Sequence, residues 1–153
     1  MVELSKLTNI SRENIKRLEC PEFEAKPWVT GSPLSERRVA IVSSAGIHRR
    51  DDAHFTGSDS SYRAIPNDTD SNDIVMSHIS LGYDRTAYQQ DLDAILPLQH
   101  MANLADEGKI GSVASTHYSF MGGANALSME PHARELAGAL KADNVDAVVL
   151  LPV

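Results

Sequence analysis

The sequence predicts an α/β fold in which a three-layer arrangement places a mostly parallel sheet between flanking helices. Two segments, 39–42 and 145–151, are almost entirely apolar and rich in β-branched residues, a pattern typical of strands covered on both faces. Other segments place apolar residues at helical spacing between such strands. Because strands and helices alternate along the chain, a parallel sheet with helices on its faces is the expected architecture.

The first 26 residues are predicted to form a helical arm and connector outside the main domain. A short helix is expected within 1–19, with Ser11 capping the turn that begins at Arg12. Three prolines and a glycine between residues 21 and 33 then interrupt regular structure, and Trp28 is the large side chain expected to anchor this connector. Residues 1–26 are therefore assigned to the arm, and residues 27–153 to the α/β domain.

The strands of this domain are predicted to be short. The first, 39–42, leads into a glycine turn, and a polar loop rich in Asp and Ser is expected from 49 to 73. Further strands are expected at 74–76 and within 110–120. The last, 145–151, has the composition of a strand buried on both faces. Since only two residues follow it, the sheet is expected to be incomplete at its C-terminal end.

Two amphipathic helices are predicted from apolar residues spaced i, i+3, i+4, i+7. The first pattern occupies 98–105, with Pro97 before it and Gly108 after it. The second occupies 133–140 and follows Pro131. Proline at the start of a helix and glycine just past its end are the residues that these positions favour.

The composition excludes several function classes. The 153 residues carry a net charge of −7, and Lys and Arg never occur in runs longer than two, so the positive surface needed for nucleic-acid binding is missing. The N-terminus lacks the apolar core of a signal peptide, and no segment approaches the roughly 20 apolar residues of a membrane span. Cys20 is the only thiol, which excludes an intrachain disulfide. A cytoplasmic protein without nucleic-acid or membrane partners is expected.

The strongest candidates for chemistry follow predicted strands, because the ligand crevice of an open α/β sheet lies beyond the carboxyl ends of its strands. Backbone N–H groups of the turn 43–47 are placed to hold an anion or carboxylate, with His48 reaching over the crevice; an ordinary glycine turn is the alternative. His78 and His117 are candidate general acids or bases, since histidine titrates near neutrality.

Other side chains carry weaker signals. The Arg63 guanidinium is a candidate to bind a ligand carboxylate through two parallel hydrogen bonds; the alternative is an ion pair with a neighbouring Asp. Ser119 precedes a second glycine turn but lacks the G-x-S-x-G elbow of a hydrolase. The histidines match no usual spacing of metal ligands and the acidic loop lacks EF-hand order, so no metal is assigned.

A series of motifs, in order along the chain from residue 27 to the end, resembles one family. The series includes Pro27-Trp28, Ser44-Ala45-Gly46-Ile47-His48, Tyr62-Arg63-Ala64-Ile65-Pro66, Ser77-His78 and His117-Tyr118-Ser119-Phe120-Met121-Gly122. Together these motifs resemble the selenoprotein B family of the glycine, sarcosine and betaine reductases and of D-proline reductase.

The resemblance implies a component of a reductase that cleaves a C–N bond of an amino acid or amine, using a selenocysteine or cysteine nucleophile. It implies no cofactor in this chain but a pyruvoyl group in a partner subunit, and hence a homo- or hetero-oligomer with other reductase subunits. The histidines are then expected to donate protons and Arg63 to bind a carboxylate. Around this substrate or partner crevice the following residues are placed: Gly46, His48, Arg63, His78, His117, Ser119 and Gly122.

The resemblance stops before the family's nucleophile. In the family, the strand resembling 146–153 leads directly into the redox-active selenocysteine or cysteine, whereas this sequence ends at Val153. One hypothesis is a UGA selenocysteine codon read as a stop; the 153 residues alone are then expected to be inactive and to self-associate through the last strand. The alternative is a non-catalytic α/β module that binds a small anionic ligand at the turn 44–48. A metal-dependent hydrolase ranks last.

Overall fold

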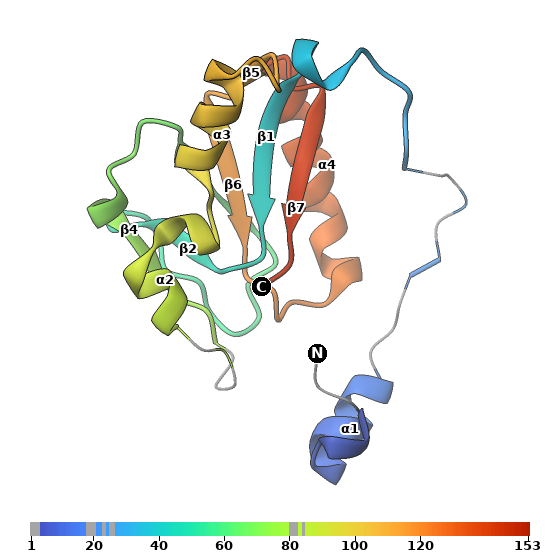
Figure 1. Cartoon of the computed structure of the whole chain (residues 1–153). Helices are drawn as coiled ribbons and strands as arrows, with labels where there is room; N and C mark the ends of the chain where they lie inside the picture. The colour runs from blue at the N-terminus through green and yellow to red at the C-terminus, as the bar shows by residue number, and fades with distance from the viewer. Residues whose placement is uncertain (1–3, 18–20, 23, 25–26, 80–82, 84) are drawn as a thin grey trace.

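A central β-sheet carries helices on both of its faces (Figure 1). The computed structural model describes residues 4–17, 21–22, 24, 27–79, 83 and 85–153, and within these residues the sheet has five strands. The α/β fold expected from the alternation of strands and helices is therefore confirmed.

The middle strand of the sheet is β1 (Arg38–Ser43), and it pairs in parallel with three others. β5 (Ser112–Val113) lies beside its start and β6 (Thr116–Phe120) beside its end, while β7 (Ala147–Leu151) occupies the opposite edge. β3 (Tyr62–Pro66) pairs antiparallel with β6. The sheet therefore combines a parallel centre with one antiparallel strand at its margin.

The polar segment 49–73 contains structure that its composition did not predict. β3 lies within it, and five of its residues pair with β6. This strand is short and ends in a proline, so its sequence resembles a loop; burial of Ile65 against the core stabilises it as a strand. The predicted strand β4 (Ile74–Met76) pairs antiparallel with β2 (Ile47–Arg49) in a separate two-stranded sheet.

The apolar stretch predicted as one strand at 110–120 is divided into β5 and β6. Between them, the Ser115 N–H donates to a carboxylate oxygen of Asp143 at 2.7 Å, and the Ser115 carbonyl accepts from the Asn67 N–H. The Ile41 N–H bonds to the ring of His117. These bonds to distant groups replace the regular ladder and interrupt the strand.

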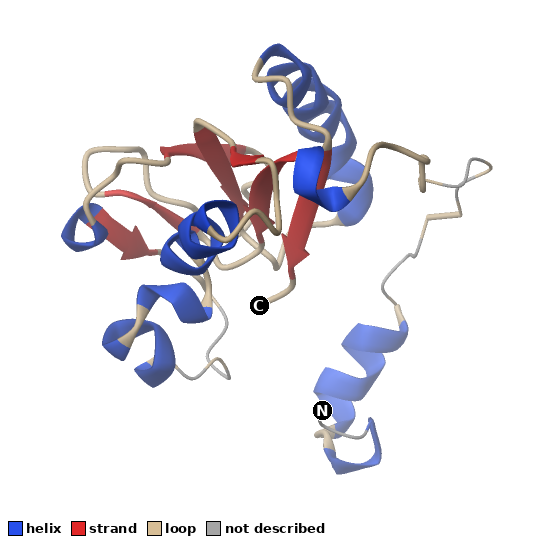
Figure 2. Ribbon diagram, turned by 45° about the horizontal axis from the view of Figure 1, so that its top comes forward, coloured by secondary structure: helices blue, strands red, loops and turns tan. Residues whose placement is uncertain are grey.

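The two long helices cover opposite faces of the sheet (Figures 1 and 2). α3 (Leu98–Asp106) confirms the first predicted helix, and Gly108 follows it with a φ of +66°. α4 (Ala126–Ala142) begins five residues before Pro131, not behind it, because the Asn125 side chain caps the helix by accepting the Leu127 N–H at 2.8 Å. Pro131 inside the helix gives up one backbone hydrogen bond.

The shorter helices are η1 (Leu4–Lys6), α1 (Asn9–Lys16), η2 (Leu34–Glu36), η3 (Ser71–Asp73), α2 (Thr86–Gln90) and η4 (Leu92–Ala94). Helix α1 lies away from the sheet (Figure 1). It begins before Ser11, whose N–H donates to the Thr8 hydroxyl at 3.2 Å, so Thr8 and not Ser11 provides the cap. Trp28 is 87% exposed and does not anchor the connector. Cys20 lies outside the described residues.

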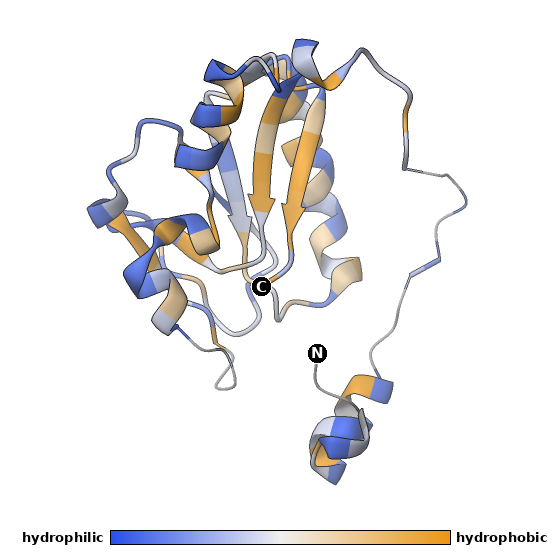
Figure 3. Ribbon diagram, viewed as in Figure 1, coloured by the Kyte–Doolittle hydropathy of each residue, from blue (hydrophilic) through white to orange (hydrophobic). Residues whose placement is uncertain are grey.

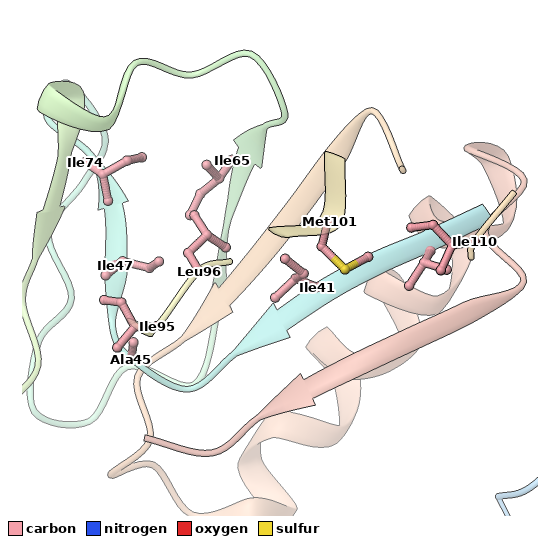
Figure 4. Close-up of a cluster of buried hydrophobic side chains, with 10 residues drawn as sticks. Ile41, Ala45, Ile47, Ile65, Ile74, Ile95, Leu96, Met101 and Ile110 are labelled. Carbon is pink, nitrogen blue, oxygen red and sulfur yellow. The ribbon is translucent and has the colours of Figure 1, made fainter. Parts of the chain in front are cut away.

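The larger hydrophobic core lies on the α3 face of the sheet (Figure 4). Side chains from both sheets, from the segment after η4 and from α3 meet there (Figure 4). The buried members are Val39, Ile41, Ala45, Ile47, Ile65, Ile74, Ile95, Leu96, Met101 and Ile110. On the α4 face, a smaller cluster joins Tyr118, Phe120 and Leu136. Because β2 and β4 share the larger core with β1, the turn between β1 and β2 is held in place.

The prediction that the last strand is buried on both faces is wrong. β7 is apolar along its length (Figure 3), yet Val148, Val149 and Leu150 are 39%, 36% and 71% exposed. The physical reason is position: β7 pairs with β1 along one edge, and Leu136 of α4 packs against Tyr118 and Phe120 of β6, which leaves Val148 and Leu150 uncovered.

Candidate functional site

The carboxyl ends of β1, β6 and β7 meet at one edge of the sheet, where a ligand crevice is expected. Ser44 joins them. Its N–H donates to the Leu151 carbonyl at 3.0 Å, its carbonyl accepts the Gly122 N–H at 3.0 Å, and its hydroxyl accepts the Val153 N–H at 2.9 Å. The three strand ends are thus fixed relative to one another.

Glycine is required at both turns of this edge. Gly46 has a φ of +63°, and a Cβ there would lie 3.2 Å from the backbone of His78. A Cβ at Gly122 would lie 2.9 Å from the Ser44 carbonyl oxygen. Both predicted glycines therefore lie at this edge of the sheet, where the absence of a Cβ allows close approach of neighbouring backbone.

Replacing Gly122 with Ala is expected to destabilise the fold by about 1–3 kcal/mol, because the new methyl group contacts rigid backbone. Gly138→Ala is the matched control: Gly138 is exposed in α4 with no atom within 4 Å of its Cβ position, and helix propensity predicts a gain of about 0.5–1 kcal/mol. Urea unfolding followed by circular dichroism measures both. Equal stability of the two variants would contradict the close approach at Gly122.

The backbone N–H groups of the turn 43–47, which were predicted to hold an anion or carboxylate, are not free to do so. The N–H groups of the turn all donate to protein acceptors: Ser44 to the Leu151 carbonyl, Ala45 to the Ser43 hydroxyl, Gly46 to the Phe120 carbonyl and Ile47 to the Ser119 hydroxyl. Backbone donors that are already used cannot bind an anion without breaking these bonds. The expectation was wrong because three of these four acceptors come from β6 and β7, far away in the sequence, and the fourth is the Ser43 hydroxyl at the end of β1.

His48 and Ser77 form a hydrogen-bonded pair on the two-stranded sheet. The Nδ1 of His48 lies 2.6 Å from the Arg49 carbonyl oxygen, and its Nε2 lies 2.8 Å from the Ser77 hydroxyl. A carbonyl only accepts, so in the neutral ring Nδ1 carries the proton and Nε2 accepts from Ser77. This order of hydroxyl, imidazole and carbonyl is the arrangement that prepares a serine hydroxyl for proton transfer.

Ser77 was missing from the residues predicted for the crevice. Its only signal in the sequence is its place beside His78 in the Ser77-His78 motif. The antiparallel pairing of β2 with β4 sets His48 opposite Val75, and this register brings the Ser77 hydroxyl to the imidazole. The Ser77 N–H also donates to the Gly46 carbonyl at 2.8 Å, which ties the pair to the glycine turn.

His78 lies next to this pair and against the Gly46 turn. Its ring is 5.3 Å from that of Tyr83, and its carbonyl accepts a hydrogen bond from Arg85 at 2.6 Å. Burial lowers the pKa of His78, and the charge of Arg85 acts in the same direction. The predicted role as proton donor is therefore less favoured than that of a neutral proton acceptor.

Arg63 is fully engaged within the protein. Its five N–H groups donate to the Ala53, Tyr62 and His54 carbonyls, the Ser61 hydroxyl and the Asp59 carboxylate. The guanidinium also lies 4.3 Å from the centre of the Phe55 ring. Burial alone would raise the pKa of Asp59, but bonds from Ser61 and Arg63 outweigh it and lower that pKa. Arg63 thus organises residues 53–61, which is the alternative that the sequence left open.

His117 and Ser119 are buried within β6 and support the backbone. The Ile41 N–H donates to Nδ1 of His117 at 3.0 Å, so Nε2 carries the ring proton and donates to the Asn67 side chain at 3.1 Å. Burial lowers the pKa of His117 to about 4. The Ser119 hydroxyl accepts the Ile47 N–H at 3.0 Å. The structure therefore gathers Gly46, Gly122, His48, His78 and Ser119 near the strand ends. Arg63 lies opposite Ser119 in the β3–β6 pair, and the Phe55 ring lies between its guanidinium and the His48 ring, so Arg63 is beside this group although its donors are used. His117 lies earlier in β6, away from the strand ends.

The described part of the chain contains neither a candidate metal centre nor a candidate membrane span. No group of three or more His, Cys, Asp or Glu side chains is placed to hold a metal ion. Among the same residues, no helix has the length and apolar character needed to cross a membrane.

Comparison with known proteins identifies relatives along most of the chain. The family model of glycine/sarcosine/betaine reductase selenoprotein B matches residues 7–152. The D-proline reductase subunit gamma of Acetoanaerobium sticklandii is 38% identical over 120 residues, which cover 76% of this chain and 49% of that protein. The glycine reductase complex component B subunit gamma of Symbiobacterium thermophilum is 34% identical over 122 residues, covering 76% and 28%. No solved structure matches.

A third relative extends the match to nearly the whole chain. The glycine reductase complex component B subunit gamma of Carboxydothermus hydrogenoformans is 29% identical over 153 residues, covering 94% of this chain and 35% of that protein. The chain thus spans about half or less of the length of these relatives, which are subunits of reductase complexes. By its match over residues 7–152, this chain belongs to the glycine/sarcosine/betaine reductase selenoprotein B family.

Proposed function

We propose that this chain is a component of a reductase complex that cleaves a C–N bond of an amino acid or amine. The observation that carries this proposal is the family match over residues 7–152, together with 38% identity to a D-proline reductase subunit. Substrates of the relatives' class, small amino acids and N-methylated amines, are the first to test.

Reductive cleavage of a C–N bond requires two electrons and two protons. One proton ends on the carbon and the other on the departing nitrogen. The electrons are proposed to come from a selenol or thiol together with a second thiol, which by the family resemblance would follow the strand 146–153. This pair would close to a selenosulfide or disulfide as it gives up two electrons, and an external dithiol would reduce it again. A pyruvoyl group in a partner subunit would withdraw electrons from the bond to be broken. The residues of this chain then have to position the substrate and move protons.

The His48–Ser77 pair is the proposed route for one of these protons. His48 is fully buried and its Nε2 lies 2.8 Å from the half-buried Ser77 hydroxyl, so a proton passes between ring and crevice through that hydroxyl. The carbonyl of Arg49 fixes the ring by accepting from Nδ1. His78, whose pKa burial lowers, serves as a second proton acceptor beside it.

Ser77→Ala is expected to lower the turnover of the assembled complex by about 10- to 100-fold, since it removes the hydroxyl that connects His48 to the crevice. The complex, purified with its partner subunits and a dithiol reductant, is assayed with D-proline, glycine, sarcosine and betaine by mass spectrometry of the products. Ser35→Ala, at an exposed serine of η2, is the control and should leave turnover unchanged. A complex that reduces none of these compounds would refute the proposed function.

The alternative, a module that holds a small anion at the turn 44–48, is disfavoured by the structure. The N–H groups of Ser44, Ala45, Gly46 and Ile47 are all donated to protein acceptors. Calorimetric titration of the isolated chain with acetate, phosphate and glycine should accordingly show no binding at this turn.

A further inference from the structure

An apolar groove lies between α4 and β7 on the face of the sheet opposite α3. Its volume is about 630 Å³, and it is lined by Val42, Met129, Ala133, Leu136, Val148 and Leu150 among others. Among the residues that the structure describes, those that line it carry no charged side chain. Leu150 is 71% exposed although it belongs to a strand of the central sheet. Apolar area of this kind is a feature of binding surfaces.

The edge of β7 adjoins this groove. β7 pairs with β1 on one side, and its other side has no strand partner among the residues that the structure describes. The Leu151 carbonyl accepts from Ser44, which follows β1, so the backbone groups of Leu151 point toward β1. Backbone N–H and C=O groups alternate in direction along a strand, so those of Val148 and Leu150 point away from β1, toward the open edge. Isolated sheet edges are usually protected by Lys, Pro or bulges, and the sequence of β7, AVVLL, contains none of these.

We infer that this edge and groove together bind one polypeptide segment, a strand that pairs in parallel with β7 and an amphipathic helix that packs in the groove beside α4. The segment belongs to the part of the selenoprotein B subunit that these 153 residues do not match. This inference rests on family membership and does not depend on the proposed reductase activity.

Two observations specify this occupant. The matched region covers 49% of one relative and 28% of another, so half or more of each of those subunits lies outside the match and is long enough to supply a strand and a helix. All three partners of β1 are parallel to it, and successive parallel strands are joined by helices that lie on a face of the sheet. The uncovered face over Val148 and Leu150 is where the helix of the next such unit would lie.

A photo-crosslinking amino acid at position 150, in the complex purified with its partner subunits, tests the inference directly. Mass spectrometry of the cross-linked peptide is expected to find selenoprotein B sequence from outside residues 1–153. The control places the same amino acid at position 104, a 38% exposed leucine of α3 on the opposite face, where this cross-link should be absent. A cross-link from position 150 to a second copy of residues 1–153, to an unrelated subunit, or to no protein would overturn the inference.

Leu150→Lys is expected to weaken assembly of the complex at least about 10-fold, because it places a charge in an apolar groove. Leu104→Lys should assemble as the unsubstituted chain does. Assembly is measured by analytical ultracentrifugation, and hydrogen exchange of the Val148 and Leu150 amides should slow on assembly. Equal assembly of the two variants would count against the groove. Ser77→Ala should assemble normally, so failure of this surface is distinguishable from failure of the proposed chemistry.

Discussion

Lowering the pH from 7 to 4 is expected to cost the fold about 3 kcal/mol through His117 alone. Burial lowers the pKa of this side chain to about 4 in the folded protein, against 6.5 as its ordinary value. The unfolded chain therefore binds a proton that the folded chain does not accept across this window. The stabilisation is complete above pH 6.5 and is lost as the pH falls toward 4.

Urea unfolding at pH 7, 6, 5 and 4 measures this loss, with His117→Gln as the comparison. A glutamine amide offers an acceptor for the Ile41 N–H and a donor for Asn67, the two partners of the ring, but does not titrate. The loss of stability between pH 6.5 and pH 4 should therefore be smaller in the variant by about 3 kcal/mol. Equal pH dependence of the two proteins would show that His117 is not a buried neutral group.

Arg38→Met is expected to destabilise the chain by about 3 kcal/mol, since several carbonyl and carboxylate acceptors lose a charged donor together. The guanidinium bonds to the Asp143 carboxylate, the Asp143 and Val113 carbonyls and the Ser115 hydroxyl, each at 2.7 Å. These bonds connect the start of β1, the end of α4 and the break between β5 and β6. Arg38 is only 25% exposed, which makes water a poor substitute for them.

Denaturant unfolding of Arg38→Met, Asp143→Asn and the double variant measures how strongly this pair is coupled. Burial alone would raise the pKa of Asp143, but bonds from Arg38 and Ser115 outweigh it and lower that pKa. Its contribution is therefore present at neutral pH and is lost as the pH falls below about 4. Arg134→Met is the control, because Arg134 pairs with Glu130 on the exposed face of α4 and should cost less than about 0.5 kcal/mol. Similar losses from both arginines would disprove the network.

The candidate site was predicted in part. Gly46, Gly122, His48 and His78 lie at or beside the strand ends, as the position of each after a strand indicated. Arg63 was predicted to bind a ligand carboxylate because a guanidinium suits that role. The residue type alone does not show whether its N–H groups are already bonded to other groups of the protein. The ion pair with Asp59 is the alternative that the sequence offered, but the bonds to the Ala53 and His54 carbonyls depend on how residues 53–61 fold back over the guanidinium.

By itself, the sequence determined the elements whose signals are local: the strand at β1, the helix α3 with its glycine end, and the apolar character of β7. It also carried the ordered motifs of the selenoprotein B family, which the match over residues 7–152 confirms. These features depend on side-chain periodicity and residue identity within short windows, so they can be recognised without knowing what packs against them.

Only the tertiary structure decided which groups are free and which are engaged. β3 is a strand because β6 lies beside it, and β7 is exposed because it lies at an edge. His117 is a neutral structural side chain because Ile41, 76 residues earlier in the chain, donates to its ring. Burial and hydrogen-bond partners are set by segments that are distant in sequence and adjacent only after folding. For that reason the turn predicted to hold an anion has no N–H group to offer, whereas the Ser77 hydroxyl meets His48.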